Sequence, residues 1–276
     1  MLGVSLVIAS PLALLVVVAF GTAYAFGRER WSRAAGRPLV GTGIALLFYA
    51  GLLTVAVALA SPLDTAAATS LPAHMTQHVL LLAVAGPLLA FGMPLPTLLW
   101  ALPTRGRRRS VAVTRHVARA HDRHFASWIA AALVVEAVVM WGWHVPAAYE
   151  AALRDPALHA VEHASFLLVS SVAWWSVTNG RRSLRGAAAI AALIGSVPGM
   201  ALGVAMVLAP YPWYPSYVGA DPAAALSSQQ LAGVIMWAFG GMAAVIAGVA
   251  LFASWLATET HEPAVRMAPV VGAGTP

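Results

Sequence analysis

The feature that most constrains the fold is a series of apolar runs long enough to cross a bilayer. A transmembrane helix needs roughly 20 apolar residues. The sequence contains seven such runs, at residues 3–26, 39–60, 73–92, 126–144, 157–178, 185–208 and 225–256. Only 9% of the residues are charged, against about 25% in a soluble domain. The sequence therefore predicts an all-α, polytopic membrane helical bundle with seven transmembrane helices. Residues 1–257 would form a single transmembrane domain, and residues 258–276 a disordered cytoplasmic tail.

The arginines predict how this bundle is oriented. Fifteen of the sixteen lie in the loops 27–38, 101–125 and 179–185 or in the C-terminal tail, and only Arg154 lies in an alternate loop. Cytoplasmic loops carry the excess of basic residues. We therefore expect the N-terminus outside and the C-terminus in the cytoplasm. Loop 101–125 either rests on anionic lipid or, as we favour, is a solvated positive loop. The charge is confined to such loops, so the expected environment is lipid and no nucleic-acid partner is predicted.

Two histidine pairs and a single histidine lie at the ends of the apolar runs. His74 and His78 begin the third run, His159 and His163 begin the fifth, and His144 closes the fourth. A spacing of four places both rings of a pair on one helix face. With the orientation above, all five rings lie at the outer face. Polar residues in membrane helices are costly and usually face the bundle interior.

This arrangement predicts a metal or haem site. Neutral imidazole binds copper, zinc and iron, and the positive end of a helix dipole disfavours its protonated form. Cysteine is absent, so thiolate ligands are excluded. We expect at least three of the five rings to converge within about 8 Å, which one ion could bridge, with His144 between the two pairs. Glu136 should point into the bundle. The supporting residues predicted around the ligands are Met75, Glu136, Met140, Glu162 and Gln230.

Several segments together resemble one family. They are His74-Met-Thr-Gln-His78, Trp143-His144-Val-Pro146 with Tyr149, His159-x-x-Glu162-His163 with Phe166, Tyr211 to Tyr217, and Gln229-Gln230 to Trp237 with Gly240. Over about residues 60–256 the chain resembles the CtaG family of bacterial cytochrome c oxidase assembly factors. Ser228 stands where that family often has an acidic residue. The resemblance implies a multi-pass protein of the bacterial inner membrane that matures haem-copper oxidase through its copper centre, with an oxidase subunit in the membrane as partner.

The leading hypothesis is thus an assembly factor, not an enzyme, that holds copper at the extracytoplasmic face and delivers it. A haem-binding membrane cytochrome is the first alternative, because histidines on facing helices can ligate haem. A copper-tolerance transporter is the second, although Glu136 is the only acid well inside a span. The weakest is a zinc hydrolase. His159-x-x-Glu162-His163 has the spacing of the inverted metalloprotease motif, but the chain lacks the soluble catalytic domain that normally carries it.

Overall fold

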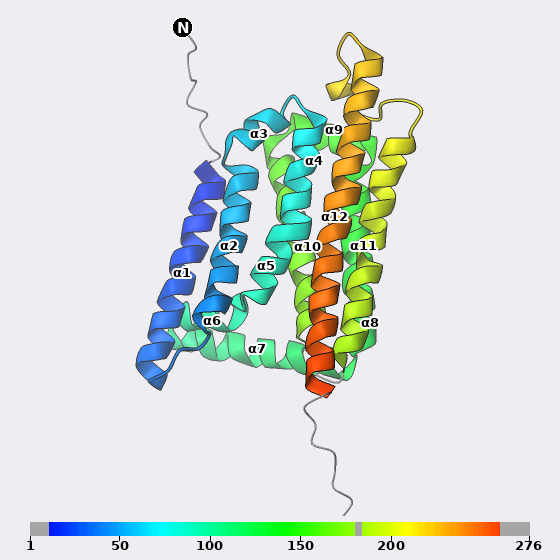
Figure 1. Cartoon of the computed structure of the whole chain (residues 1–276). Coiled ribbons are helices and arrows are strands. Elements are labelled where there is room, and N and C mark those ends of the chain that lie inside the picture. Colours follow the sequence, from blue (N-terminus) through cyan, green and yellow to red (C-terminus); the bar gives the residue numbers. More distant parts are fainter. Residues whose placement is uncertain (1–10, 180–183, 260–276) are drawn as a thin grey trace, which may run out of the picture.

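The computed structural model of the chain describes residues 11–179 and 184–259, and these residues form helices and turns without a strand. Most long helices run side by side (Figure 1). They are α1 (Pro11–Ala35), α2 (Thr42–Leu59), α8 (Phe125–His144), α10 (Pro156–Thr178), α11 (Arg185–Leu208) and α12 (Pro222–Glu259). One further helix is continuous but changes type, from α4 (Leu71–Val79) through the π-helix η1 (Leu80–Ala85) to α5 (Gly86–Phe91). The connecting helices are α3 (Pro62–Ala67), α6 (Pro94–Ala101), α7 (Thr104–Arg123), α9 (Pro146–Arg154) and η3 (Pro215–Tyr217).

The all-α membrane bundle predicted from the sequence is confirmed. Among the described residues, six helices are long and apolar enough to cross a membrane. The predicted fifth span, now α10, has 23 residues and runs alongside the others (Figure 1), yet it is not one of the six. Its histidines, Glu162 and serines lower its hydropathy. The count of seven spans and the orientation of the termini stay predictions.

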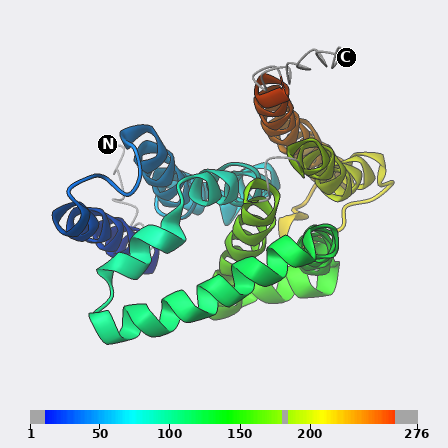
Figure 2. The same cartoon turned by 90° about the horizontal axis from the view of Figure 1, so that it is seen from below.

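Two of the expected loops are wrong. Residues 27–35 continue α1, so Arg28, Arg30 and Arg33 lie on its last turns, because arginine is a good helix former. Residues 104–123 form α7, which lies across one end of the bundle (Figures 1 and 2). Helix α12 continues to Glu259, and the rest of the predicted disordered tail lies outside the described residues.

Capping residues set where the helices with histidines begin. The Ser70 side chain accepts a hydrogen bond from the backbone N–H of Ala73 at the start of α4. The Asp155 carboxylate accepts from Ala157 and Leu158 at the start of α10. Proline follows within the first two positions of both helices, where its missing N–H has no cost. These caps fix the turns on which His74 and His159 lie.

A close crossing brings the two histidine helices together. Helix α10 contacts η1, α5, α8 and α9. Gly86 permits the approach, because a Cβ atom at that position would lie 2.7 Å from the Cβ atom of Ser170. The Ser170 hydroxyl donates to the Leu82 carbonyl at 2.5 Å, within the π-helix. Such π-helical turns often occur at functional sites, and this one lies directly below His78.

Candidate metal centre

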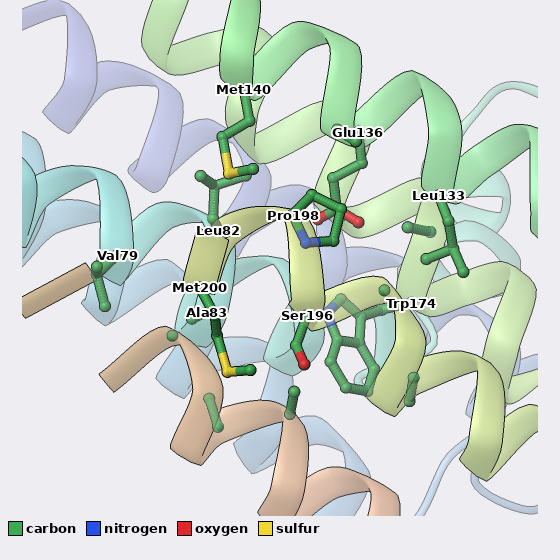
Figure 3. A pocket seen from close by; sticks show the side chains of 18 of the residues that line it. Val79, Leu82, Ala83, Leu133, Glu136, Met140, Trp174, Ser196, Pro198 and Met200 are labelled. Carbon is green, nitrogen blue, oxygen red and sulfur yellow. The ribbon is translucent and has the colours of Figure 1, made fainter. Parts of the chain in front are cut away.

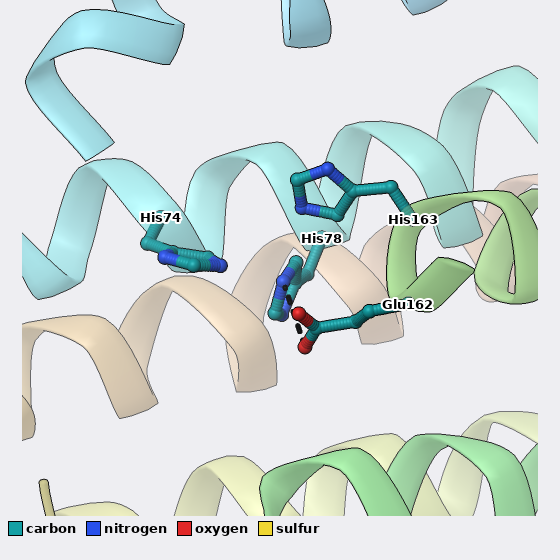
Figure 4. Close-up of side chains that lie close together, drawn as sticks. All are labelled: His74, His78, Glu162 and His163. Atoms are coloured by element: carbon teal, nitrogen blue, oxygen red, sulfur yellow. Dashed lines mark ion pairs between the residues drawn. The ribbon is translucent and has the colours of Figure 1, made fainter. Parts of the chain in front are cut away.

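The structure groups four potential ligands from α4 and α10. One ligand atom from each of His74, His78, Glu162 and His163 lies within 4.8 Å of the others (Figure 4). The exposed fractions of these residues are 1%, 0%, 0% and 5%, in the same order. Glu162, predicted only as a supporting residue, therefore belongs to the group itself.

The predicted convergence of the histidine rings is confirmed. The ring centroids of His74 and His78 are 4.6 Å apart, and that of His163 lies 5.8 Å from His74 and 5.4 Å from His78. His159 lies at the rim, 4.2 Å from His163 and 5.1 Å from His74. The predicted place of His144 between the two pairs is wrong. Its ring lies beside His78, at 5.2 Å, because the rings of the two pairs contact each other directly and leave no place between them.

Hydrogen bonds determine which nitrogen of His78 is free to bind. A carbonyl oxygen only accepts, so His144 Nδ1–H donates to the Met140 carbonyl at 2.7 Å. In neutral imidazole the second nitrogen is then an acceptor. His144 Nε2 accordingly accepts from His78 Nδ1–H at 3.3 Å. This leaves the lone pair of His78 on Nε2, which faces Glu162. His144 therefore orients a ligand, and both of its own nitrogens are engaged.

A second chain of hydrogen bonds orients His74 in the same way. The Tyr217 hydroxyl donates its only proton to the Ala67 carbonyl at 2.9 Å. Its oxygen is then available to accept from His74 Nδ1–H, also at 2.9 Å. The lone pair of His74 therefore lies on Nε2. Metal-bound histidines usually donate their other N–H in this manner, which fixes the tautomer and the ring orientation.

The coordinating atoms have no partners of their own. In the part of the chain that the structure describes, both Glu162 oxygens lack a hydrogen-bond partner. The same is true of the Nε2 atom of four histidines, which are His74, His78, His159 and His163. His78 Nε2 and Glu162 Oε1 face each other at 3.5 Å. Two ligands of one tetrahedral ion at about 2 Å lie roughly 3.3 Å apart. Buried polar atoms are normally satisfied, so this donor set fits a metal ion.

Tyrosines cover the centre. The Tyr149 ring lies 5.1 Å from that of His74 and stacks on Tyr214 at 4.0 Å. Burial raises the pKa of Tyr149 well above its ordinary value and raises that of Tyr217 to about 12. Both phenols are therefore neutral at physiological pH. They act as hydrogen-bonding and space-filling groups and do not supply charge.

Two side chains from outside the segment, those of Gln229 and Glu150, hold the tyrosine-bearing segment 209–221 in place. Its own Tyr214 and Tyr217 donate further hydrogen bonds to the carbonyls of His144 and Ala67. The Gln229 amide oxygen accepts from the Trp213 N–H at 2.6 Å. The Glu150 carboxylate accepts from the N–H of Ser216 at 2.9 Å and from its hydroxyl at 2.5 Å. Gln230, which we expected to support a histidine, makes no such bond among the described residues; its buried neighbour Gln229 has the structural role. Adjacent helical residues point about 100° apart, so only one of the two glutamines can face inward, and the sequence does not show which one.

The remaining predicted residues lie around the centre without joining the ligand group. Met75 and Met140 are buried in the apolar cluster beside it. Glu136 points into the bundle as expected, where it lines a pocket of about 100 Å³ with Met140, Pro198 and Met200 (Figure 3).

The hydrogen bond between Tyr217 and His74 was not predicted from the sequence. Tyr217 belongs to the Tyr211–Tyr217 segment that resembles the family, but it lies 143 residues along the chain from His74. The packing of Tyr149 on the histidine rings was not predicted either.

Comparison with known proteins gives one match. No curated protein and no solved structure matches the chain. The family model described as cytochrome c oxidase caa3 assembly factor, Caa3_CtaG, matches residues 22–258. This range begins within α1, ends one residue before the end of α12, and contains every residue of the candidate centre. The chain therefore belongs to the cytochrome c oxidase caa3 assembly factor family.

Proposed function

We propose that this assembly factor holds a copper ion on His74, His78, Glu162 and His163 and delivers it to a membrane subunit of the oxidase. The observation that carries the proposal is the set of buried, unpartnered lone pairs directed at one another. With no cation bound, both Glu162 oxygens and the Nε2 atoms of His74 and His78 are buried without a hydrogen-bond partner in the described residues, which is costly. Imidazole nitrogen is a good ligand for copper.

The arrangement suits a carrier that releases its ion. His159 is the least buried of the clustered histidines, and its Nε2 has no partner in the described residues. It lies against His163 and His74, so it can exchange places with a ligand as the ion enters or leaves. Histidine and carboxylate ligands without thiolate hold copper less tightly than a closed cysteine site would.

The same geometry favours a carrier over a zinc hydrolase. In the inverted metalloprotease motif both histidines bind the metal and the glutamate acts as a base. Here Glu162 lies in the ligand group with His163, whereas His159 lies outside it. Glu162 is therefore placed to ligate the ion, and this supports a non-catalytic role.

The first test is copper stoichiometry in detergent-purified protein. We expect about one copper per chain in the wild type, and loss of most of it in His78→Ala and in Glu162→Gln. His116→Ala is the matched control, because His116 is exposed on α7, and it should retain full copper. Equal copper in His78→Ala and wild type would remove the proposed site. A Soret band in protein from native membranes would favour the haem alternative.

The second test addresses delivery. Cells that lack the gene should assemble oxidase with less copper, and wild type but not His78→Ala should restore it. Normal oxidase copper with the His78→Ala protein present at wild-type level would contradict delivery from this centre.

A further inference from the structure

A second, larger pocket lies at the opposite end of the bundle from the histidines. It has a volume of about 750 Å³ and is enclosed by α7 and by the neighbouring ends of α1, α5, α6 and α10. Figure 2 views the bundle from this end and shows α7 running across it. The metal centre does not use this pocket.

The pocket is strongly basic on one side. Arg107, Arg108 and Arg115 of α7 all line it. None of the α7 arginines forms an ion pair in residues 11–179 and 184–259. The described residues therefore leave the positive charge of these arginines without an ion-pair partner, so it is available to an anion.

Two buried donors in the pocket wall also lack an acceptor within the described chain. They are Arg107 Nη1 and Trp31 Nε1. The two side chains belong to one cluster, because the Arg107 guanidinium lies 4.0 Å above the Trp100 ring and the Trp100 ring meets that of Trp31 at 4.9 Å. Unpaired buried donors are costly, and one phosphate group could accept from both.

The rest of the wall is apolar. Leu95, Leu99 and Val111 line it with the tryptophans. A free inorganic anion would leave this surface without a partner, whereas a ligand with both a phosphate and a hydrocarbon portion would cover it. Tryptophan and arginine at a membrane boundary are also the residues that contact lipid headgroups.

Helix α7 is fixed in place, so the pocket is preformed. His121 is 1% exposed, and its Nε2–H donates to the Ser176 carbonyl of α10 at 2.9 Å. At the other end, Arg30 Nη1 of α1 donates to the Leu102 carbonyl, just before α7, at 3.0 Å. An amphipathic helix that merely rested on the membrane would need neither bond.

From these features we propose that the pocket between α7 and α1 binds the phosphate headgroup of an anionic phospholipid, with its glycerol and upper acyl carbons against the leucines. Arg107 and Trp31 donate to the phosphate, and Arg108 and Arg115 supply further positive charge. The basic helix expected as a solvated loop is thus one wall of a lipid site.

The test is native mass spectrometry of the full-length protein in detergent, titrated with phosphatidylglycerol or with phosphatidylcholine of the same acyl chains. We expect phosphatidylglycerol to bind at least tenfold more tightly. Each basic residue near an anionic surface contributes about fivefold in affinity. The double variant R107Q/R108Q should therefore bind phosphatidylglycerol about 25-fold more weakly. The matched control R109Q/R119Q removes two arginines that do not line the pocket, and it should bind as the wild type does.

A second variant tests shape without changing charge. Ala118 lines the pocket, and Ala118→Trp should fill it and reduce phosphatidylglycerol binding while all arginines remain. If R107Q/R108Q and R109Q/R119Q lose the same amount of phosphatidylglycerol affinity, the lipid is attracted by the overall positive charge of α7, and the proposed site is overturned. Displacement of the lipid by millimolar inorganic phosphate would overturn the phospholipid assignment. Copper content should not change in any of these variants.

Discussion

Residues outside the ligand group decide which imidazole nitrogen is presented at the centre. Tyr217 accepts a hydrogen bond from His74 Nδ1–H, and His144 accepts one from His78 Nδ1–H. Each acceptor in turn donates its own proton to a backbone carbonyl. The lone pairs of His74 and His78 are therefore preset on Nε2 before an ion arrives. Sequence spacing placed the pairs on one helix face but contains no information on tautomers.

Tyr217→Phe tests the first of these chains. The substitution removes the acceptor for His74 Nδ1–H while it keeps the ring, so His74 loses its fixed tautomer and orientation. Removing such a partner typically lowers metal affinity by roughly 10- to 100-fold. Competition with a copper chelator should show this loss in Tyr217→Phe. Tyr211→Phe lies in the same segment but is 64% exposed, and its affinity should match the wild type. Equal affinities for both variants would contradict the role of Tyr217.

His144→Phe tests the second chain and separates orienting from binding. The phenyl ring fills a similar volume but cannot accept from His78 Nδ1–H. Copper stoichiometry should stay near one per chain while affinity falls by roughly 10- to 100-fold. His124→Phe, at the exposed start of α8, is the control. Complete loss of copper in His144→Phe would instead make His144 a ligand, as the sequence first suggested.

At the scale of helices, the site depends on how closely α5 and η1 cross α10. The sequence predicted both helices, because each contains an apolar run of about 20 residues. It did not predict the π-helix at residues 80–85 or the connecting helices α7 and α9. The π-helix follows from tertiary packing on Ser170, and arginine-rich α7 is helical because it docks through His121. Such long-range contacts have no local signature.

Gly86→Ala should destabilise the protein. A methyl group there would overlap Ser170, and overpacking of this kind typically costs about 1–3 kcal/mol. At Gly142 of α8 a Cβ atom would meet nothing within 4 Å, so Gly142→Ala should instead stabilise by about 0.5–1 kcal/mol. Thermal unfolding in detergent should show a lower melting temperature than wild type for Gly86→Ala and a higher one for Gly142→Ala. A Gly86→Ala protein as stable as Gly142→Ala would show that the helices do not cross this closely.

At the scale of the whole molecule, the two ends differ in chemistry. Helix α4, which carries His74 and His78, lies at one end of the bundle, and the arginine-rich α7 lies at the other (Figure 1). The positive-inside rule predicts that the histidine end is extracytoplasmic. Sequence alone could place the five histidines at one depth, because each lies at a span terminus. It could not show that Glu162 completes the group, because that depends on the rotation of α10 against α4.

The orientation can be tested with single cysteines, because the chain contains none. Gly219→Cys lies in the segment that covers the centre, and Arg109→Cys lies on α7. A membrane-impermeant maleimide should label Gly219→Cys in intact spheroplasts and Arg109→Cys only after permeabilisation. The reverse pattern would invert the topology and place the metal centre in the cytoplasm.

The hydrogen bonds that hold segment 209–221 in place affect how fast a bound ion could leave the centre. Tyr217 both covers the centre and accepts a hydrogen bond from His74 Nδ1–H. Displacing the segment would therefore expose the centre to solvent and remove the hydrogen bond that orients His74. The segment is held by Glu150 and Gln229, neither of which belongs to the ligand group. For the proposed copper ion, exchange with bulk solution is therefore slow while the segment stays closed. A protein that binds the segment and displaces it would obtain the ion quickly. Release of the ion would then depend on contact with that protein and not on the concentration of free ion in solution.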